Sequence, residues 1–497
     1  MKMKKYLLSI IFLGVLATSC NKEFFDINDN PNLPTSASMT PDLIAPRAMH
    51  ETGRIMTQNY APLAHWMGMW SRGGDYGPTI EWESYRITTN FGAGNWNAWY
   101  SNLNDYNILI DKAKAGNNKM FEAIGRTMKT IGFMYLVDSY NNVPYSEAFQ
   151  LSNYITPKYD KGEDIYKSLL AELDSALANV NAATAGGDPK IQSADIMFGG
   201  DATMWKKFIN TQRLRLVLRL SQVNLVSHAQ ELQKVTAEGF LGAGESAMVN
   251  PNYSKAENKQ NPFWDSYKLT PLDAPIDKYN RANNYALNLL RNNGDIRYQY
   301  YYEPARSPIS NNTYYGYNFG ENLPNSDPYK SDNSSGVAGP GLAKSAAQDQ
   351  WILTSVESMF MQAEARQRGY IPGSAETMFY DAIRESFNWL GVPNPTATAN
   401  AYIGSTTEWV NFAGAANKIR LIIYQKYLST IGMVPFEVWT DYRRTGYPEV
   451  PLSLTSSRGP NIPLRYQYPQ AEYDYNSSNV QSEGKIDPFT SKIFWDN

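Results

Sequence analysis

The residue whose type and position most clearly specify a reaction is Cys20, the only cysteine among 497 residues. It follows a basic start, an apolar run from Tyr6 to Ala17, and the small residues Thr18 and Ser19. This order is typical of a secretory signal peptide, and the run is shorter than the ~20 apolar residues that a membrane-spanning helix needs. We therefore predict that residues 1–19 are removed and that the Cys20 thiol is acylated, as in bacterial lipoproteins. The alternative is a stray thiol that is discarded with the signal peptide.

The segment after Cys20 predicts a tether. Residues 20–41 are rich in Asn, Asp, Pro and Ser, which form turns and linkers. No second shift in composition follows, so we expect residues 42–497 to form one domain. Because the only cysteine is used by lipid, this domain must fold without disulfides or thiolate metal ligands.

A second set of side chains with useful chemistry lies between residues 71 and 94, where glycines interrupt the chain. It combines guanidinium groups, a carboxylate and flat rings: Arg72, Asp75, Tyr76, Trp82, Tyr85 and Arg86. Such a mixture can bind a polyhydroxylated ligand by ring stacking and paired hydrogen bonds. The same rings can instead pack beneath the loop, and the residues alone leave both possibilities open.

The composition argues against several other classes of protein. A net charge of −3 without a basic stripe argues against nucleic-acid binding. The three histidines, His50, His65 and His228, have no metal-binding spacing. No Gly-x-Ser-x-Gly motif is present. A glycoside hydrolase needs only two suitably separated carboxylates, and with 48 acidic residues the sequence leaves that class open.

Specific pairs of side chains have simpler explanations than catalysis. Glu357 and Glu364 lie seven residues apart on one predicted helix face, where we expect them to cap the helix or pair with Arg366 and Arg368. Trp66 and Trp70, like Trp96 and Tyr100, are spaced i, i+4. On helices this spacing favours core packing.

The elements that must position these residues are mainly helices. Met120, Ile124, Met128, Ile131 and Tyr135 recur every three or four residues, which predicts one apolar face. Similar stripes occur at 165–180, 202–221, 351–368, 374–390 and 417–431. We therefore predict a mainly α protein with long irregular loops and little strand.

The longest predicted loop, residues 294–348, is rich in Tyr, Gly, Asn and Pro. Loops of this length in compact domains are usually functional or disordered, and the many tyrosines favour order. We expect binding surface there.

Several segments, in this order along the chain, resemble the SusD/RagB family of outer-membrane nutrient-binding lipoproteins of Bacteroidetes. Cys20 followed by FFDINDNPN resembles the amino terminus of that family. VESMFMQAEA at 356–365 resembles its segment ending in Ala-Glu-Ala, and FEVWTDYRRTGYP at 436–448 resembles its late Asp-x-x-Arg helix end. The other similar segments are residues 96–107, 121–149, 159–177 and 462–476.

The resemblance implies a SusD-like scaffold of degenerate tetratricopeptide-type helix pairs, held at the outer membrane by lipid on Cys20 and facing the exterior. It implies a protein that binds a glycan, without cutting it and without a cofactor, and delivers it to a SusC-like TonB-dependent barrel. Gly432 and Met433 replace the common Glu-Gly-x-Arg pattern, as in a divergent branch. Peptide uptake, a surface glycoside hydrolase and a ligand-free helical scaffold are the alternatives.

The resemblance also suggests ligand-binding residues. The region 75–96 is similar to the family's first binding loop, which implies roles for Asp75, Trp82, Arg86 and Trp96. Tyr76 is added because it lies in the same loop. We also expect contributions from Trp264, Tyr267 and Tyr301, because they lie in later loop-rich sequence that could face the first loop.

Overall fold

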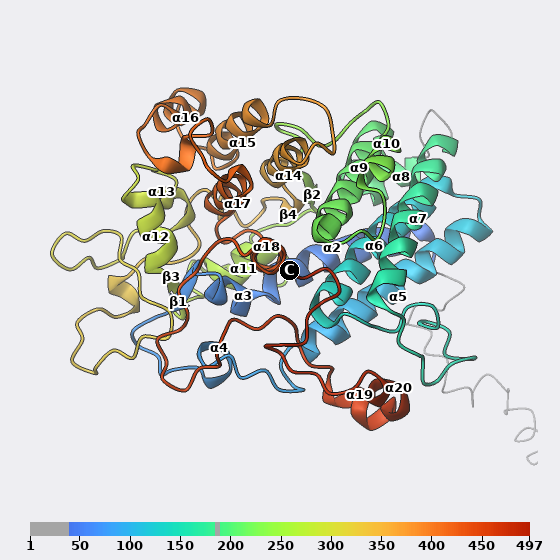
Figure 1. Ribbon diagram of the computed structural model, residues 1–497, viewed down its shortest axis with the longest axis horizontal. Coiled ribbons are helices and arrows are strands. Elements are labelled where there is room, and N and C mark those ends of the chain that lie inside the picture. The colour runs from blue at the N-terminus through green and yellow to red at the C-terminus, as the bar shows by residue number, and fades with distance from the viewer. Residues whose placement is uncertain (1–38, 184–188) are drawn as a thin grey trace, which may run out of the picture.

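The computed structural model describes residues 39–183 and 189–497. Cys20, the predicted signal peptide and most of the predicted tether lie outside the described residues. Within them, helices dominate and strands are few and short, which confirms the predicted mainly α fold (Figure 1).

Long helices from the first half of the chain pack in sequence order on one side of the molecule (Figure 1). The helix α5 contacts α6, α6 contacts α7, and α7 contacts α9, while α2 lies against α5 and α6. This succession is what stacked helix pairs produce. The bounds are α2 (Pro41–Gln58), α5 (Ala93–Ala115), α6 (Lys119–Tyr140), α7 (Gly162–Ala182) and α9 (Ala202–Arg219).

A second group of helices comes from the last third of the chain. The helix α14 packs against α15 and α17, and it also contacts α9, so the two groups share one core. The bounds are α14 (Ser355–Gln367), α15 (Ala375–Trp389), α16 (Pro395–Ile403), α17 (Lys418–Ser429) and α18 (Pro435–Thr445).

Two small antiparallel sheets complete the body. Strand β1 (Trp70–Arg72) pairs with β3 (Asn280–Ala282), with Ser71 opposite Arg281. Strand β2 (Ala247–Val249) pairs with β4 (Gln350–Leu353). The remaining elements are α3 (Ala61–Trp66), α4 (Ile80–Glu83), α8 (Pro189–Ala194), α10 (His228–Gln233), α11 (Pro262–Tyr267), α12 (Asn284–Arg291), α13 (Tyr298–Tyr301), α19 (Gln470–Tyr475), α20 (Ser477–Ser482), η2 (Leu220–Gln222), η3 (Ser331–Asn333) and η4 (Glu408–Val410).

Local sequence explains where several helices begin. The side chains of Asp201, Thr354, Ser374 and Asn417 precede α9, α14, α15 and α17, and each accepts a hydrogen bond from a backbone N–H of the first turn. Such caps satisfy donors that have no partner inside the helix.

The predicted helical stripes correspond to real helices with one correction. The stripe at 351–368 begins as β4, and the helix starts only at Ser355. The run QWIL is short, buried and apolar, and such a run fits a strand as well as a helix. Trp66 and Trp70 are buried, which confirms their predicted packing role. The helical spacing assumed for them is wrong, because Trp66 ends α3 and Trp70 begins β1.

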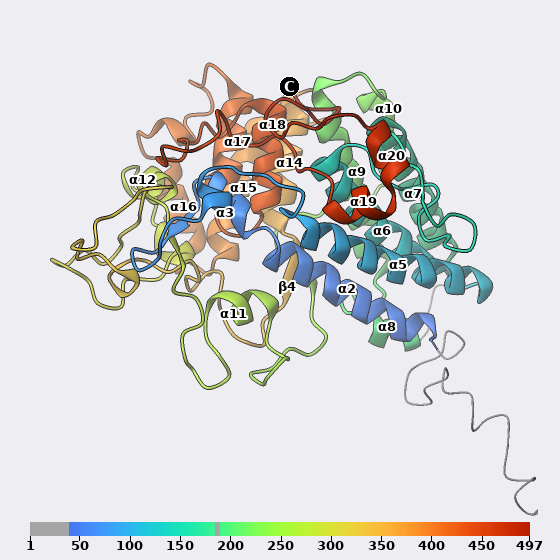
Figure 2. The same ribbon diagram turned by 90° about the horizontal axis from the view of Figure 1, so that it is seen from below.

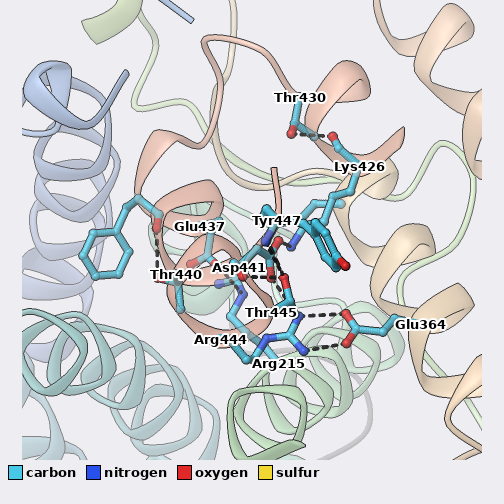
Figure 3. A network of polar contacts seen from close by, with 12 residues as sticks. Arg215, Glu364, Lys426, Thr430, Glu437, Thr440, Asp441, Arg444, Thr445 and Tyr447 are labelled. Carbon is cyan, nitrogen blue, oxygen red and sulfur yellow. Dashed lines mark hydrogen bonds and ion pairs between the residues drawn. The ribbon is translucent and has the colours of Figure 1, made fainter. Parts of the chain in front are cut away.

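A buried network of charged side chains joins α9, α14, α17 and α18 (Figure 3). Arg215 pairs with Glu357 at 2.8 Å and Arg219 with Glu437 at 2.5 Å. Burial disfavours the charged form of Glu437, but Arg215 and Arg219 lower its pKa to about 2. Because buried charges without partners are strongly destabilising, these helices depend on one another.

The network corrects one expectation about Glu357, which pairs with the distant Arg215 and not with its neighbours on α14. The Arg366 guanidinium instead donates to the backbone oxygen of Ser374. The expected pair between Glu364 and Arg368 is present at 2.8 Å.

Candidate functional site

Loops from three distant parts of the chain meet around the β1–β3 pair, at the end of the molecule where the long loops project (Figures 1 and 2). They are residues 73–86, 268–280 and 303–335. We call the group of side chains that these loops carry at Asp75, Tyr76, Trp82, Tyr279, Tyr315 and Tyr329 the loop surface.

The first loop is held in place by Arg72 at the end of β1. Its Nε donates to Glu83 Oε1 at 2.7 Å, and its Nη2 donates to the backbone oxygen of Glu321 at 2.9 Å. Both Arg72 and Glu83 are buried. Burial raises the pKa of Glu83, against the opposing effect of Arg72. This pair therefore braces the loop and is not available to a ligand.

Asp75 links the first loop to the third. Its Oδ2 accepts a hydrogen bond of 2.8 Å from the backbone N–H of Ser331. Partial burial opposes ionisation, but hydrogen bonds from Ser331 lower the pKa of Asp75. Asp75 is otherwise exposed, so its charged carboxylate can accept hydrogen bonds from a ligand.

Three rings form the centre of the loop surface. Tyr76 and Tyr279 meet edge to face with centroids 5.2 Å apart, and Trp82 meets Tyr279 in the same way at 5.9 Å. Tyr76 is 39% exposed, while Trp82 and Tyr279 are half-buried. The hydroxyl groups of Thr79 and Tyr279 share a hydrogen bond that ties α4 to the second loop.

The sequence analysis did not single out Tyr279, Tyr315 or Tyr329. The rings of Tyr315 and Tyr329 stack in parallel, 3.7 Å apart, within the third loop. The signal that could have found these two was the tyrosine content of residues 294–348. No comparable signal in the sequence marked Tyr279, which directly precedes the short strand β3.

Arg86 follows Trp82 by four residues in the sequence and is exposed. Within the part of the chain that the structure describes, its side chain makes no hydrogen bond or ion pair. Its guanidinium is therefore free to donate to a ligand.

Trp96, Tyr267 and Tyr301 are not on the loop surface. Trp96 is 5% exposed and packs against Tyr100 and Tyr140 with centroids 4.8 and 4.9 Å away. Tyr267 is 7% exposed and meets Trp70, and Tyr301 is fully buried. The expectation that they face a ligand is corrected, because each side chain points into the core. Trp264 is half-buried on α11.

His65 lies beneath the loop surface. It packs edge to face on Trp82 at 5.2 Å, and its Nε2 lies 2.8 Å from Asn280 Oδ1. Burial lowers its pKa to about 4, so the ring is neutral near pH 7. At 1% exposure it supports the rings and cannot act on a ligand.

Two findings across the described residues bear on the type of site. Among residues 39–183 and 189–497, no group of three or more His, Cys, Asp or Glu side chains is placed to hold a metal ion. In the same residues no helix is long and apolar enough to cross a membrane.

The fold and the loop surface define a helical protein that displays aromatic loops at one end, and comparison with known proteins identifies its family. A SusD-like family model described as "Starch-binding associating with outer membrane" matches residues 31–469. The chain belongs to this family, which confirms the predicted resemblance. No curated protein sequence matched the chain.

Solved structures agree on the fold. A SusD homologue from Bacteroides fragilis superimposes with a TM-score of 0.74 at 22% identity, covering 92% of this chain and 99% of the other. A chitin-binding SusD homologue from Flavobacterium johnsoniae gives a TM-score of 0.74 at 24% identity, covering 91% and 98%.

Proposed function

We propose that this protein is a cell-surface lipoprotein that captures a nutrient glycan on the loop surface and passes it to a SusC-like TonB-dependent transporter. Acylated Cys20 anchors it to the outer membrane, and residues 42–497 form one binding domain. Family membership supports this role, as do the names of its relatives, which include starch and chitin binding.

The observation that carries the proposal is the cluster of Tyr76, Trp82 and Tyr279 at the end of a rigid helical body. Tyr and Trp rings offer flat apolar faces that stack on sugar rings and polar tips that hydrogen-bond. In the same loop, Asp75 adds an exposed acceptor and Arg86 an exposed donor fork. Because Arg72 and Asp75 already fix the loop, little ordering cost remains when a ligand binds.

The proposed role is binding without hydrolysis. A glycosidase needs a protonated carboxyl group within reach of the glycosidic oxygen. Glu83, whose pKa is raised, is 1% exposed and paired with Arg72. Asp75 is accessible, but its pKa is lowered. Neither carboxyl combines the pKa and the exposure that a general acid requires.

Calorimetric titration of residues 21–497 with maltooligosaccharides and chitooligosaccharides tests the proposal. We expect the combined change Tyr76→Ala and Trp82→Ala to weaken binding at least tenfold, equivalent to about 1.4 kcal/mol. The matched control is Tyr154→Ala, because Tyr154 is 42% exposed on a different loop, and it should bind as the native protein does. If the native protein, the double variant and Tyr154→Ala bound with equal affinity, the loop surface would not be the glycan-binding site. Peptides are titrated in parallel, and binding heat from peptides but from no oligosaccharide would favour peptide uptake instead.

A further inference from the structure

A cavity separate from the loop surface lies beside the β1–β3 pair, between α12 and the segment 451–454. Its volume is about 560 Å³, within the range of small-molecule pockets. None of its lining residues belongs to the loop surface. The lining is mostly amide and apolar: Gly68, Asn283, Asn284, Tyr285, Asn288, Leu289, Asn292, Asn293, Asn318, Phe319, Pro451, Leu452 and Leu454. We call this the amide pocket.

The helix α12 supplies one wall. Tyr285, Asn288 and Asn292 recur at three and four residues, so they lie on one face. The Arg291 guanidinium donates to Asn288 Oδ1 at 2.8 Å and to the Tyr314 backbone oxygen at 3.1 Å. The Asn288 amide is thereby oriented with its NH₂ group unused. In the described ranges, nothing hydrogen-bonds to the side-chain amide of Asn292.

The opposite wall is fixed by three hydrogen bonds of the segment that follows Leu452. The Leu454 N–H donates to the Phe319 oxygen at 2.9 Å, and the Ser453 N–H donates to the Tyr85 hydroxyl at 2.9 Å. The Thr455 hydroxyl donates to the Gly320 oxygen at 3.2 Å. These bonds fix the backbone that carries Leu452 and Leu454, which line the pocket.

The floor of the pocket requires a glycine. Gly68 has φ +65°, and a Cβ there would lie 2.8 Å from Cδ1 of Tyr285. The absence of a side chain lets the Tyr285 ring lie directly on the backbone.

The lining carries no Asp, Glu, Lys, Arg or His. Its one titratable group is Tyr285, whose pKa is raised by burial, so it is neutral near pH 7. Two other cavities, of about 410 and 250 Å³, differ in this respect: Lys344, Asp349 and Glu385 line the first, and Glu408 and Arg420 the second.

This lining selects for a neutral ligand with many hydroxyl groups. A charged group entering the pocket would lose water without meeting an opposite charge on any lining residue. The adjoining Arg291 directs its guanidinium to the Asn288 amide oxygen and the Tyr314 backbone oxygen. An asparagine amide both donates and accepts, as a sugar hydroxyl does, and the leucines and Tyr285 suit the apolar faces of a sugar ring.

We propose that the amide pocket is a second saccharide site, specific for uncharged sugars, in which Asn288 and Asn292 bind hydroxyl groups. The class of ligand rests on the proposed glycan-binding function. The proposal adds a binding site separate from the loop surface and a preference for uncharged saccharides.

The test is calorimetric titration with two sets of probes. Neutral maltooligosaccharides and chitooligosaccharides form one set, and chitosan oligosaccharides, which have the same backbone as chitooligosaccharides but carry ammonium groups, form the other. The combined change Asn288→Leu and Asn292→Leu removes both amides at similar size. The control is Asn104→Leu, which alters an exposed asparagine on the distant α5.

The native protein should bind at least one neutral series at least tenfold more tightly than the charged one. The double leucine variant should lose at least tenfold in affinity for that series while melting like the control. A further variant with Asn288→Asp and Asn292→Asp should reverse the preference towards chitosan oligosaccharides.

Native affinity for every neutral probe in the double leucine variant would overturn the proposal, as would a native protein that binds none of them. Loss of binding only with Tyr76→Ala and Trp82→Ala would leave the proposed function standing and reject the amide pocket. Loss only with the asparagine variants would keep the pocket and reject the loop surface.

Discussion

Arg444 and Glu364 form a two-pronged ion pair in the core, Nη1 to Oε1 at 2.5 Å and Nη2 to Oε2 at 2.8 Å (Figure 3). Arg444 also donates to Asp441 at 2.8 Å. Glu364 is the central residue of the Ala-Glu-Ala segment of α14, and Asp441 and Arg444 form the Asp-x-x-Arg end of α18. The segments 356–365 and 436–448, each of which resembles the family, therefore contact each other through this ion pair.

Replacing Arg444 with Met should lower the free energy of unfolding by about 3–5 kcal/mol, because the buried carboxylates of Glu364 and Asp441 would lose the cation that they share. Glu364 would keep only Arg368, and Asp441 only Lys426. Urea denaturation followed by circular dichroism measures this. Arg384→Met is the control: Arg384 pairs with Asp381 at 2.8 Å on the surface, where such pairs contribute ~0–1 kcal/mol. Equal losses in the two variants would mean that the buried pair has no special role.

A pH dependence should follow from His65, whose pKa is about 4 in the fold against 6.5 ordinarily. Between these values the unfolded chain binds more protons than the native protein, so this histidine makes stability rise with pH and fall as pH drops from 6.5 to 4. The whole difference corresponds to about 3 kcal/mol. Denaturation of native protein and of His65→Gln at pH 4, 5, 6 and 7 should show a stability gap that shrinks towards pH 4. If the difference in unfolding free energy between the native protein and His65→Gln did not change with pH, His65 would not be a buried neutral ring.

Gly68→Ala should damage the amide pocket by pushing the Tyr285 ring into it. Gly239→Ala is the matched control, since Gly239 also has a positive φ of +73° but no atom within 4 Å of the position that a Cβ would take. Both changes carry the backbone cost of about 1 kcal/mol or more, and the melting temperature of Gly68→Ala should fall further. Neutral saccharide binding, measured by calorimetry, should weaken only for Gly68→Ala. If Gly68→Ala and Gly239→Ala had the same melting temperature and the same saccharide affinity, the Tyr285 ring would be able to move aside without altering the pocket.

Trp96 and Trp82 should respond differently to truncation. Trp96→Ala should cost about 3–5 kcal/mol, because it opens a cavity in the core. Trp82→Ala should cost less, since its ring is only partly covered. Thermal unfolding of the two variants makes the comparison. A larger loss for Trp82 would show that its ring serves chiefly as packing.

On the proposed function, Cys20→Ala should release the protein from membranes while leaving its melting temperature unchanged, because the change removes the proposed acylation site and leaves residues 42–497 unaltered. Fractionation of cells followed by immunoblotting would show this, with Ser38→Ala in the same amino-terminal region as control. Continued membrane retention of Cys20→Ala would exclude a lipid anchor on this residue.

Local patterns in the sequence predicted the helices well. The stripe from Met120 to Tyr135 lies within α6, and the stripe at 374–390 corresponds to α15. The strand at 350–353 was missed because its partner, β2, lies about a hundred residues earlier in the chain. Short apolar runs acquire their structure from such partners.

The candidate site was only partly predictable for the same reason. The first loop was recognisable from Tyr76 and Trp82 among glycines, but Tyr279, their common partner, comes from a distant strand end. Trp96 and Tyr301 have the same residue types and lie in the core. Exposure depends on long-range packing, which neither composition nor spacing records. The amide pocket likewise joins α12 to residues more than 150 positions later.

Affinity electrophoresis of residues 21–497 through gels that contain starch or soluble chitin derivatives tests the central claim most directly, with reducing ends assayed in the same samples. We predict retardation by at least one polysaccharide without release of reducing ends, and loss of retardation on changing Tyr76 and Trp82 to Ala. Unretarded migration in every gel would contradict glycan capture, and release of reducing ends would make the protein a hydrolase.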